Sequence, residues 1–347
     1  MTACLLVRQP GIHTTVQDRG RTGFQNVGVP VSGPLDGVSL ALANALVGNA
    51  AGEPALEMLL QGPVLEVACA SVRVALVGGD VALEIGGTNA RRVSPGTSAR
   101  LVRGETLAVA RLGASACAYL AVEGGIQVPL CLGSASTYVR GGLGGVDGRA
   151  LRAGDHLPLA RDCVPARGEK RLAQVPALGL DQAIRVVLGP QADFFDAQAI
   201  SMFLSGEYRV SAQADRMGFR LDGPALRHVR GSDIVSDGIV AGSIQVPGSG
   251  QPIVLMADAQ TTGGYPKIAT VISADVSVLG RRRPGSMVRF AEVSVAEAQA
   301  LRRSQQSEIE RQVAALRDAA APAIVDVAAL HTANLVSGVA SARCEPM

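Results

Sequence analysis

The sequence predicts a mainly β protein with a few helices, built in two parts. Short runs of Val, Leu and Ala recur along the chain, and Gly, Pro, Asn and Asp turns separate them at the spacing typical of a barrel or sandwich. The chain has 347 residues, which is enough for two domains with a substantial core. A stretch rich in Pro, Gly and charged residues, 163–182, is typical of an interdomain linker.

These features divide the chain into four expected segments. An N-terminal β domain with one early helix is expected over residues 1–162, followed by the linker 163–182. A C-terminal β domain is expected over residues 183–292. A helix and a tail are expected over residues 293–347.

The N-terminal part is expected to begin with a strand and a helix. Leu5 to Gln9 predicts the strand. The segment 32–34, Ser-Gly-Pro, predicts a helix start with Ser or Gly near the cap, and Asp36 then falls in the first turn. Gly48-Asn49 predicts the helix end. Inside this helix, Asn44 either faces a site or is an exposed or backbone-bonded Asn.

An all-β pattern follows from residue 55 onward. Glu57 lies inside one of the apolar runs, so its carboxylate needs a partner, either as a paired structural acid or as part of a site. Cys117–Val122 predicts a later strand. The runs that predict the earlier strands are Ala55–Leu60, Val64–Ala68, Val72–Val77, Val81–Ile85, Ala99–Val102 and Thr106–Ala110.

The C-terminal part alternates strands with two helices. One helix is expected around Asp193 to Leu204, and Ser294-Val-Ala-Glu297 is a capping box that starts another, running to about Ala319. The triplet Arg281–Arg283 is most simply a solvated turn. Residues 322–347 form a tail. The expected strands are Ile184–Leu188, Tyr208–Val210, Ile253–Met256 and Ile268–Ile272.

Composition excludes several classes of function. The net charge is +2, aromatic residues make up 3% and Trp is absent, so we expect no binding to nucleic acid or to an anionic membrane. The six cysteines are scattered without a C-x-x-C pair, which excludes a typical zinc site and a disulfide framework and fits a reducing cytosol. The sequence shows neither a signal peptide nor a membrane-spanning run, so we expect a cytoplasmic protein.

The stretch 250–267 organises the chemistry of the chain. Its apolar strand gives way abruptly to a polar cluster around Gly263-Gly264, which would let a ligand or partner approach the backbone closely. A hairpin with a polar tip is an equally simple explanation. Three other stretches share this character: 18–36, 133–154 and 215–221. The polar residues of the cluster are Asp258, Gln260, Thr261, Thr262, Tyr265 and Lys267.

No complete catalytic constellation is present in the sequence. There is no G-x-S-x-G elbow, no H-E-x-x-H and no G-x-G-x-x-G after a strand, and the Gly-rich segment 140–149 lacks the Lys of a Walker loop. We expect no metal site, because the four histidines lie far apart. This absence indicates either a protein whose site another chain completes, or a binding module.

Several collinear motifs together resemble one known family. Thr14–Arg21, Gly28–Asp36, Ala43–Asn49 and Ala55–Glu57 are similar to the opening of the allophanate hydrolase subunit 2, or KipA-like, family. Further matches, which extend the similarity over about residues 5 to 292, are Gly133–Tyr138, Gly141–Arg149, Asp215–Gly218 and Gly242–Lys267. Two positions depart from the family pattern: Ala135 stands where Arg is expected, and Gly280 where Gln is usual.

The resemblance implies a two-part cyclophilin-like β-barrel architecture and a KipI-like partner. It implies the C component of a heteromeric 5-oxoprolinase, which opens 5-oxoproline to glutamate with ATP, the KipI-like B component and an A component. The first alternative is carboxyl transfer from carboxybiotin, on a biotin carrier, to a urea-like acceptor. The second is a non-catalytic regulator that binds a KipI-like protein. No cofactor is expected to be bound covalently to this chain, and ATP would act through the complex.

Both enzymatic interpretations involve a planar amide or ureido group, which suits converging carboxylate, amide and backbone N–H groups. Asp258 is the first candidate to orient such a group, with Asp215 nearby, and Lys267 or Arg216 could stabilise the developing oxyanion. The candidate substrate-binding residues are Asp18, Asn44, Glu57, Tyr138, Gln245, Thr261, Thr262, Gly263, Gly264 and Tyr265.

Overall fold

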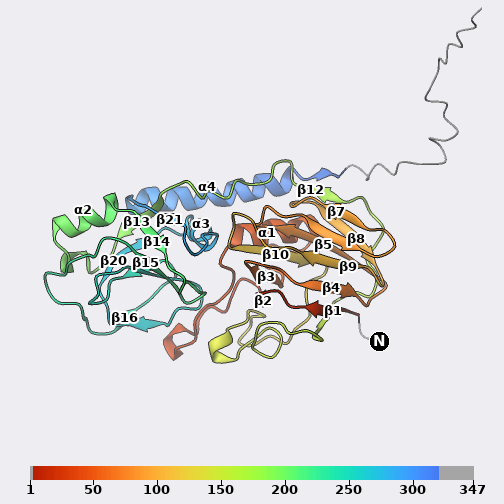
Figure 1. Ribbon diagram of the computed structural model, residues 1–347, viewed down its shortest axis with the longest axis horizontal. Coiled ribbons are helices and arrows are strands. Elements are labelled where there is room, and N and C mark those ends of the chain that lie inside the picture. Colours follow the sequence, from red (N-terminus) through yellow and green to blue (C-terminus); the bar gives the residue numbers. More distant parts are fainter. Residues whose placement is uncertain (1–2, 320–347) are drawn as a thin grey trace, which may run out of the picture.

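The computed structural model describes residues 3–319 and places two β units side by side, with one long helix lying along both (Figure 1). The N-terminal unit comprises residues 3–159 and the C-terminal unit residues 184–292. The mainly β, two-part barrel architecture that we predicted is confirmed. The tail predicted at 322–347 lies outside the described residues.

The N-terminal unit contains a six-stranded sheet, in the order β11-β1-β4-β9-β6-β7, and a five-stranded sheet, in the order β2-β3-β10-β5-β8. Neighbouring strands pair antiparallel in both sheets. The strands are β1 (Cys4–Gln9), β2 (His13–Gln17), β3 (Ala55–Leu59), β4 (Val64–Val67), β5 (Ser71–Val77), β6 (Leu83–Gly86), β7 (Arg91–Val93), β8 (Ser98–Val102), β9 (Thr106–Val109), β10 (Cys117–Val122) and β11 (His156–Pro158).

Both faces of the five-stranded sheet are buried, which explains why its strands are apolar throughout. Leu56 and Leu120 pack into the core between the two sheets. The alternate residues Ala55 and Tyr119 point to the opposite face, into a core shared with helix α1 (Gly37–Val47) and the C-terminal unit. Side chains alternate along a strand, so Glu57 belongs to this second face. The sheet thus presents a buried carboxylate toward the junction of the two units.

The C-terminal unit is built on an eight-stranded sheet, in the order β21-β14-β15-β18-β17-β20-β13-β22, which curves into a nearly closed barrel. A separate two-stranded sheet joins β16 to β19. The strands are β13 (Ile184–Leu188), β14 (Tyr208–Val210), β15 (Gly218–Asp222), β16 (Asp237–Gly238), β17 (Ser243–Gln245), β18 (Ile253–Leu255), β19 (Thr262–Gly263), β20 (Lys267–Val271), β21 (Met287–Val288) and β22 (Phe290–Glu292).

The helices begin and end close to the predicted positions, with three differences. Asp36 is the N-cap of α1, where its carboxylate accepts hydrogen bonds from the N–H groups of Val38 and Ser39, rather than a first-turn residue. The helix predicted around 193–204 is split, because Phe195 is extended between η3 (Ala192–Phe194) and α2 (Ala197–Ser205). The capping box at Ser294 is confirmed, but α4 (Val295–Ala314) ends before Ala319.

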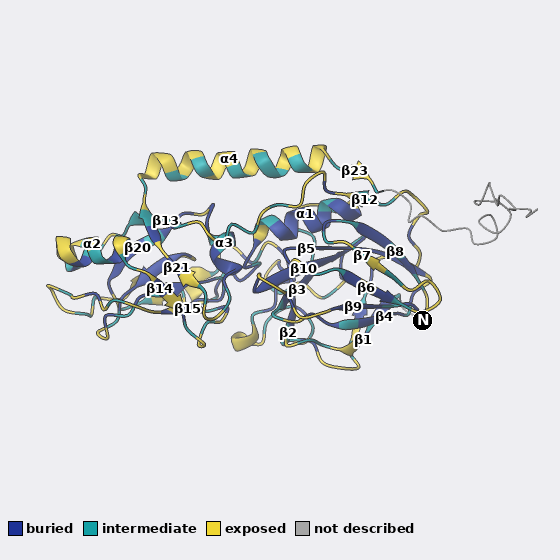
Figure 2. Cartoon of the chain, turned by 45° about the horizontal axis from the view of Figure 1, so that its top comes forward, coloured by how far each residue is buried: buried dark blue, intermediate teal, exposed yellow. Residues whose placement is uncertain are grey.

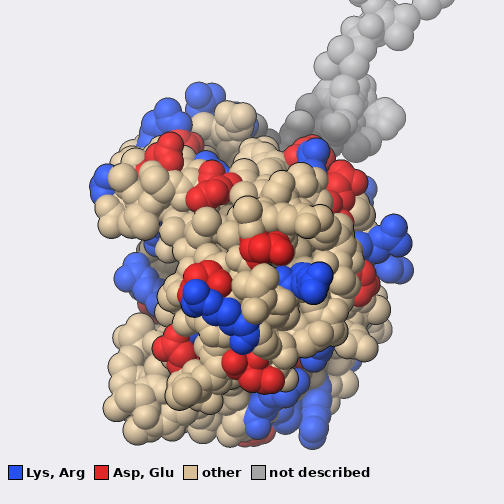
Figure 3. Space-filling model, turned by 90° about the vertical axis from the view of Figure 1, so that its left-hand side faces the viewer, with Lys and Arg blue, Asp and Glu red and all other residues tan. Residues whose placement is uncertain are grey.

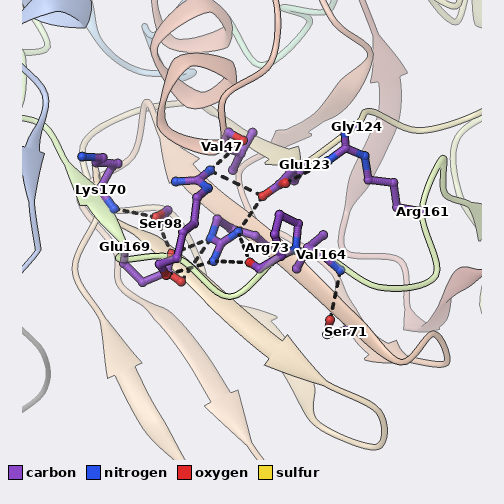
Figure 4. A network of polar contacts seen from close by, with 12 residues as sticks. Val47, Ser71, Arg73, Ser98, Glu123, Gly124, Arg161, Val164, Glu169 and Lys170 are labelled. Carbon is purple, nitrogen blue, oxygen red and sulfur yellow. Dashed lines mark hydrogen bonds and ion pairs between the residues drawn. The ribbon is translucent and has the colours of Figure 1, made fainter.

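Helix α4 and the linker fasten the outer side of the molecule. Figure 2 shows α4 mostly exposed and α1 mostly buried beneath it. After α4, β23 (Arg317–Asp318) pairs antiparallel with β12 (Lys170–Arg171) of the predicted linker. Arg73 on β5 holds the same linker through Glu169 and the carbonyl oxygens of Pro165 and Arg167 (Figure 4). The linker is therefore packed against the N-terminal unit.

The prediction that Arg281–Arg283 form a solvated turn was wrong. Arg281 and Arg282 are each 5% exposed. Arg281 donates to both carboxylate oxygens of Asp36, at 2.6 and 3.0 Å, and Arg282 donates to the carbonyl oxygen of Gln182 at 2.8 Å. The buried N-cap acid of α1 needs a cation, and the helix α3 (Val276–Gly280) delivers one from the other unit.

Close packing at the same contact explains Gly280, one of the two departures from the family pattern. A Cβ atom on Gly280 would lie 2.5 Å from the carbonyl oxygen of Leu35. Since the obstructing atom belongs to the backbone, no side-chain movement could relieve the overlap. The other departure, Ala135, is fully buried in the core of the N-terminal unit.

Candidate functional site

A buried ion cluster joins the two units at their junction. It consists of Arg216 from the C-terminal unit, Asp258 just after β18, and Glu57 on β3. Arg216 Nε and Nη2 donate to the two Asp258 oxygens, at 2.8 and 3.0 Å, while Nη1 donates to Glu57. Nη2 also donates to the carbonyl oxygen of Gly33 at 2.7 Å. We call Glu57, Arg216 and Asp258 the ion cluster.

Further donors satisfy the second oxygen of Glu57. The Leu35 N–H donates to it at 2.9 Å, and the Tyr119 hydroxyl donates to it as well. Burial, with the charge of Glu57 adding to it, raises the pKa of Tyr119 well above its usual range. The phenol therefore stays a hydrogen-bond donor, and the Glu57 carboxylate is fully occupied.

The charge of Arg216 is locked in place by this arrangement. Burial alone would lower the pKa of Arg216, but the carboxylates of Glu57 and Asp258 reverse this and raise the pKa above its usual value. Asp258 is only 5% exposed, so the prediction that it stands in an exposed polar cluster at a sheet rim was wrong. A local pattern cannot show that an arginine 42 positions away claims this carboxylate.

Asp215, the neighbour of Arg216, is the acid of this region that faces solvent. Its side chain is 55% exposed and lies 3.7 Å from Nη2 of Arg140, whose side chain is 62% exposed. Asp215 Oδ1 accepts hydrogen bonds from the N–H groups of Met217 and Gly218, at 2.8 and 3.1 Å. Oδ2 faces Arg140, which follows Val139 in η2 (Val139–Gly141). An accessible ion pair therefore bridges the two units directly beside the ion cluster.

Lys267 belongs to a second group of predicted residues, around the β16–β19 pair. Its side chain is buried, and Nζ donates to Asp237 at 2.5 Å and to the carbonyl oxygen of Gly238 at 3.2 Å. Gln245 is also buried and donates to the carbonyl oxygen of Tyr265 at 3.3 Å. The structure thus places Lys267 in a pair rather than as a free cation.

The remaining residues of this second group are partly open to solvent. Thr262 and Tyr265 are exposed, and Thr261, Gly263 and Gly264 are partly exposed. A Cβ atom on Gly263 would lie 2.5 Å from the Gln245 amide nitrogen, so this glycine permits close approach of a protein side chain. The exposed groups remain available on the outside of the C-terminal unit.

Asp18 anchors a third polar group, in the N-terminal unit. It accepts hydrogen bonds from the hydroxyls of Ser134 and Ser136 at 2.6 Å, from Ala135 N–H at 2.6 Å and from Gly20 N–H at 2.8 Å. Burial by itself would raise the pKa of Asp18, but these four donors lower it below the usual value. With its carboxylate filled, Asp18 holds the 133–138 segment that leads to the half-buried Tyr138.

The Gly-rich segment 140–149 does not form an anion cradle within the chain. The N–H groups of Gly142, Gly145 and Gly148 donate to carbonyl oxygens of the protein itself, at 3.2, 2.9 and 2.8 Å. Among residues 3–319 no group of His, Cys, Asp and Glu could hold a metal ion. Nor does that part of the chain contain a helix long and apolar enough to cross a membrane.

Asn44 lies apart from these groups. It is fully buried in α1; its amide nitrogen donates to the carbonyl oxygen of Glu53 at 2.9 Å, and its oxygen accepts from Asn49 at 3.0 Å. Of the two interpretations that the sequence left open, a bonded Asn is the one that these contacts fit. The structure brings together Glu57, Arg216, Asp258 and Asp215, and places Lys267 and Gln245 in a separate group.

His13 is the site residue that the sequence analysis missed. It lies on β2, its Nδ1 has no hydrogen-bond partner within residues 3–319, and it is close enough to the ion cluster to feel its charges. Burial and the charge of Arg216 lower the pKa of His13, against a smaller opposing effect of Glu57 and Asp258. An isolated histidine in a strand carries no sequence signal for this position.

We expect His13 to make the fold sensitive to mild acid. Because the folded pKa lies below the ordinary value of 6.5, the unfolded chain binds the proton more readily, and stability is lost as pH falls below 6.5. In a His13→Gln variant this loss should be smaller, while the two proteins should show the same pH dependence well above 6.5. Urea unfolding at a series of pH values measures the difference. Parallel curves for both proteins below pH 6.5 would contradict the assignment.

Exposed apolar side chains gather on the loops beside this site. We call this surface the loop face; it is formed by η1 (Gln25–Val27), η2 and the β16–β19 pair, which all lie at the same side of the molecule (Figure 1). The Gln25 amide donates to the carbonyl oxygen of Ile239, which links η1 to the C-terminal unit. Val27, Val240 and Val139 on this face are 67%, 57% and 40% exposed.

Charge does not explain the loop face or its surroundings. In the view of the C-terminal unit in Figure 3, Lys and Arg are interspersed with Asp and Glu, without a patch of one sign. Exposed valines next to an accessible Asp–Arg pair are instead typical of a surface that meets another protein.

Comparisons with known proteins agree with this geometry. Residues 27–292 match the family model of the carboxyltransferase domain, subdomain A and B. The chain is 39% identical over 314 residues to the C subunit of the Escherichia coli 5-oxoprolinase, covering 88% of this chain and 97% of that protein. It is 33% identical over 315 residues to urea amidolyase of Saccharomyces cerevisiae, covering 85% of this chain but 17% of that protein.

A solved structure gives the same result. The crystal structure of the Kluyveromyces lactis urea carboxylase superposes with a TM-score of 0.82 at 32% identity, covering 89% of this chain and 29% of that one. The chain therefore spans less than a third of that structure, whereas it spans nearly all of the bacterial 5-oxoprolinase protein.

Proposed function

The chain belongs to the carboxyltransferase family of subdomains A and B, and on this premise we propose that it is the C component of an ATP-dependent 5-oxoprolinase. The carrying observation is the correspondence of whole chains, since the match covers 97% of the corresponding E. coli protein and 91% of the Haemophilus influenzae one. In this function the complex opens the lactam of 5-oxoproline to glutamate, together with a KipI-like B component and an A component.

In the proposed complex, the accessible pair Asp215–Arg140 contacts the substrate amide, and the ion cluster positions it. Arg216 follows Asp215 directly in the chain, and its side chain is fixed by two carboxylates. ATP is assigned to the partner proteins, because the Gly-rich segment 140–149 uses the N–H groups of Gly142, Gly145 and Gly148 internally. The loop face supplies the surface on which a partner completes the site.

Asp215→Asn should lower the rate of 5-oxoproline conversion by the assembled complex roughly ten- to hundredfold, the value of a hydrogen bond to a charged group. Asp222→Asn, which changes an exposed acid at the end of β15, serves as the matched control and should leave the rate unchanged. ATP-dependent glutamate formation is the measurement. Wild-type rates for both variants would remove Asp215 from the site.

Val27→Asp should weaken association with the KipI-like partner, because it places a charge on a 67% exposed valine of the loop face. Val295→Asp is the control, since Val295 is 58% exposed at the start of α4, on the other side of the molecule. Co-purification with the tagged partner measures both. Equal loss of partner in the two variants would contradict the assignment of the loop face.

Carboxyl transfer from carboxybiotin to a urea-like acceptor is the second candidate function. It is favoured by the name of the matching family model and by the superposition on a urea carboxylase. The first experiment is therefore co-purification of this chain with the products of neighbouring genes, followed by assay. Glutamate from 5-oxoproline and ATP supports the first function, and a biotinylated protein in the complex supports the second. A complex that forms without either activity supports a regulator.

A further inference from the structure

A small cavity lies between the two units on the loop face. Its volume is about 170 Å³, and one wall is the segment 25–35 of the N-terminal unit, from Gln25 to Leu35. The opposite wall comes from residues 239–241 and 256–260 of the C-terminal unit. We call it the junction cavity. It is separate from the ion cluster, since none of Glu57, Arg216 and Asp258 lines it.

Ser32 in the wall of this cavity carries two unusual features. Its backbone has a φ of 56°, a left-handed conformation that costs a residue with a side chain about 1 kcal/mol or more. Its side chain is buried, with the residue 5% exposed, yet its hydroxyl has no hydrogen-bond partner within the described part of the chain. The backbone is held there by the Ser32 N–H, which donates to the carbonyl oxygen of Ala257 at 3.0 Å.

A buried hydroxyl without a partner is unfavourable by about 1–3 kcal/mol, so a serine kept in a strained conformation inside a cavity needs an explanation. A ligand that completes the hydrogen bond supplies one. The strained backbone then serves to direct the hydroxyl at a fixed position between the two units.

The wall of the junction cavity limits what such a ligand can be. None of the described residues that line it carries a charge, and most are apolar, such as Pro30, Ile239 and Met256. Gln25 already donates its amide to the carbonyl oxygen of Ile239 at 3.3 Å, while Gln260 is exposed. A cavity of about 150 Å³ holds one benzene ring, so about 170 Å³ suits a single small ring.

We propose that the junction cavity binds an uncharged five-membered ring that carries an amide or ureido group, with the Ser32 hydroxyl as its hydrogen-bond partner. Two sources share this chemistry: the lactam ring of the substrate and the ureido ring of a biotinyl group. The proposal rests on the proposed function only for this choice of source. Any charged substituent on the ring points out of the cavity, toward the exposed Gln260.

The test titrates the isolated full chain with 2-pyrrolidinone and with imidazolidin-2-one and follows backbone amide resonances by NMR. We expect both probes to shift the resonances of Ser32 and Ala257. Ser32→Ala should weaken binding about three- to tenfold, the effect of one lost hydrogen bond. Ala259→Leu should abolish binding, because Ala259 lines the cavity and is 6% exposed.

A second variant separates binding from backbone strain. Ser32→Gly removes the same hydroxyl but relieves the left-handed strain, so it should bind as weakly as Ser32→Ala while being the more stable of the two. Ser205→Ala, on the exposed end of α2, is the control with unchanged binding. The proposal is overturned if neither probe shifts the cavity resonances, or if Ser32→Ala binds with wild-type affinity.

Two further ligands distinguish the sources. Displacement of 2-pyrrolidinone by 5-oxoproline assigns the cavity to the substrate, and displacement by uncharged biotin amide assigns it to a biotin carrier; either result supports the proposal. Because these titrations use the isolated chain, they stand apart from the assay of the complex. Probe binding without 5-oxoprolinase activity would overturn the proposed function alone.

Discussion

Replacing Arg216 with methionine should lower the free energy of unfolding by about 3–5 kcal/mol, the effect of breaking a buried ion pair on one side. The reason is the state of the partners. Glu57 and Asp258 are 1% and 5% exposed, and without Arg216 two carboxylates would remain buried next to each other. The junction of the two units would also lose the hydrogen bond from Arg216 to the carbonyl oxygen of Gly33. Urea unfolding measures the change.

Two comparisons make the Arg216 result specific. Arg140→Met removes an exposed pair only, with side chains 62% and 55% exposed, and should change stability by less than about 1 kcal/mol. Adding Glu57→Gln and Asp258→Asn to Arg216→Met removes the unpaired charges, so the triple variant should recover part of the loss. If Arg216→Met unfolds at the wild-type urea concentration, the ion cluster is not what holds the junction.

Much of the fold follows from local sequence pattern. The strands of the N-terminal unit were predicted almost residue by residue, because β3, β5 and β10 are buried on both faces and consist of unbroken apolar runs between turns. The capping box at Ser294 placed the start of α4 correctly. Short elements escaped: β7 contains two arginines, and α3 is a single turn that a strand pattern resembles.

The candidate site was predictable as a set of residues but not as an arrangement. Glu57 was expected to need a partner because a carboxylate inside an apolar run is costly to bury. The identity of that partner depends on Arg216, 159 positions away, and on the packing of two units against each other. The same holds for Asp36 and Arg281, which are 245 positions apart. Ser32, whose hydroxyl lacks a partner within residues 3–319, owes its position to a φ angle that no local pattern predicts.

The second large effect is expected at Arg73, the centre of the network in Figure 4. Arg73 is completely buried and forms ion pairs with Glu123 at 2.6 Å and with Glu169 at 3.0 Å. It also donates to the carbonyl oxygens of Pro165 and Arg167, at 3.3 and 3.2 Å, and so holds the linker. Arg73→Met should lower the free energy of unfolding by about 3 kcal/mol, the lower end for a buried pair.

This lower value follows from what remains around Glu123. Arg161 and Arg167 still lie 3.1 and 3.4 Å from its oxygens, so the acid keeps part of its compensation. The linker should open locally before the whole chain unfolds, because its carbonyl oxygens lose their donor. Limited proteolysis should therefore cut Arg73→Met within residues 161–171 under native conditions. Arg92→Met, which removes a pair with Glu84 whose side chains are 75% and 54% exposed, should resist like the wild type. Protection of 161–171 in Arg73→Met would show that the linker is held by its other contacts.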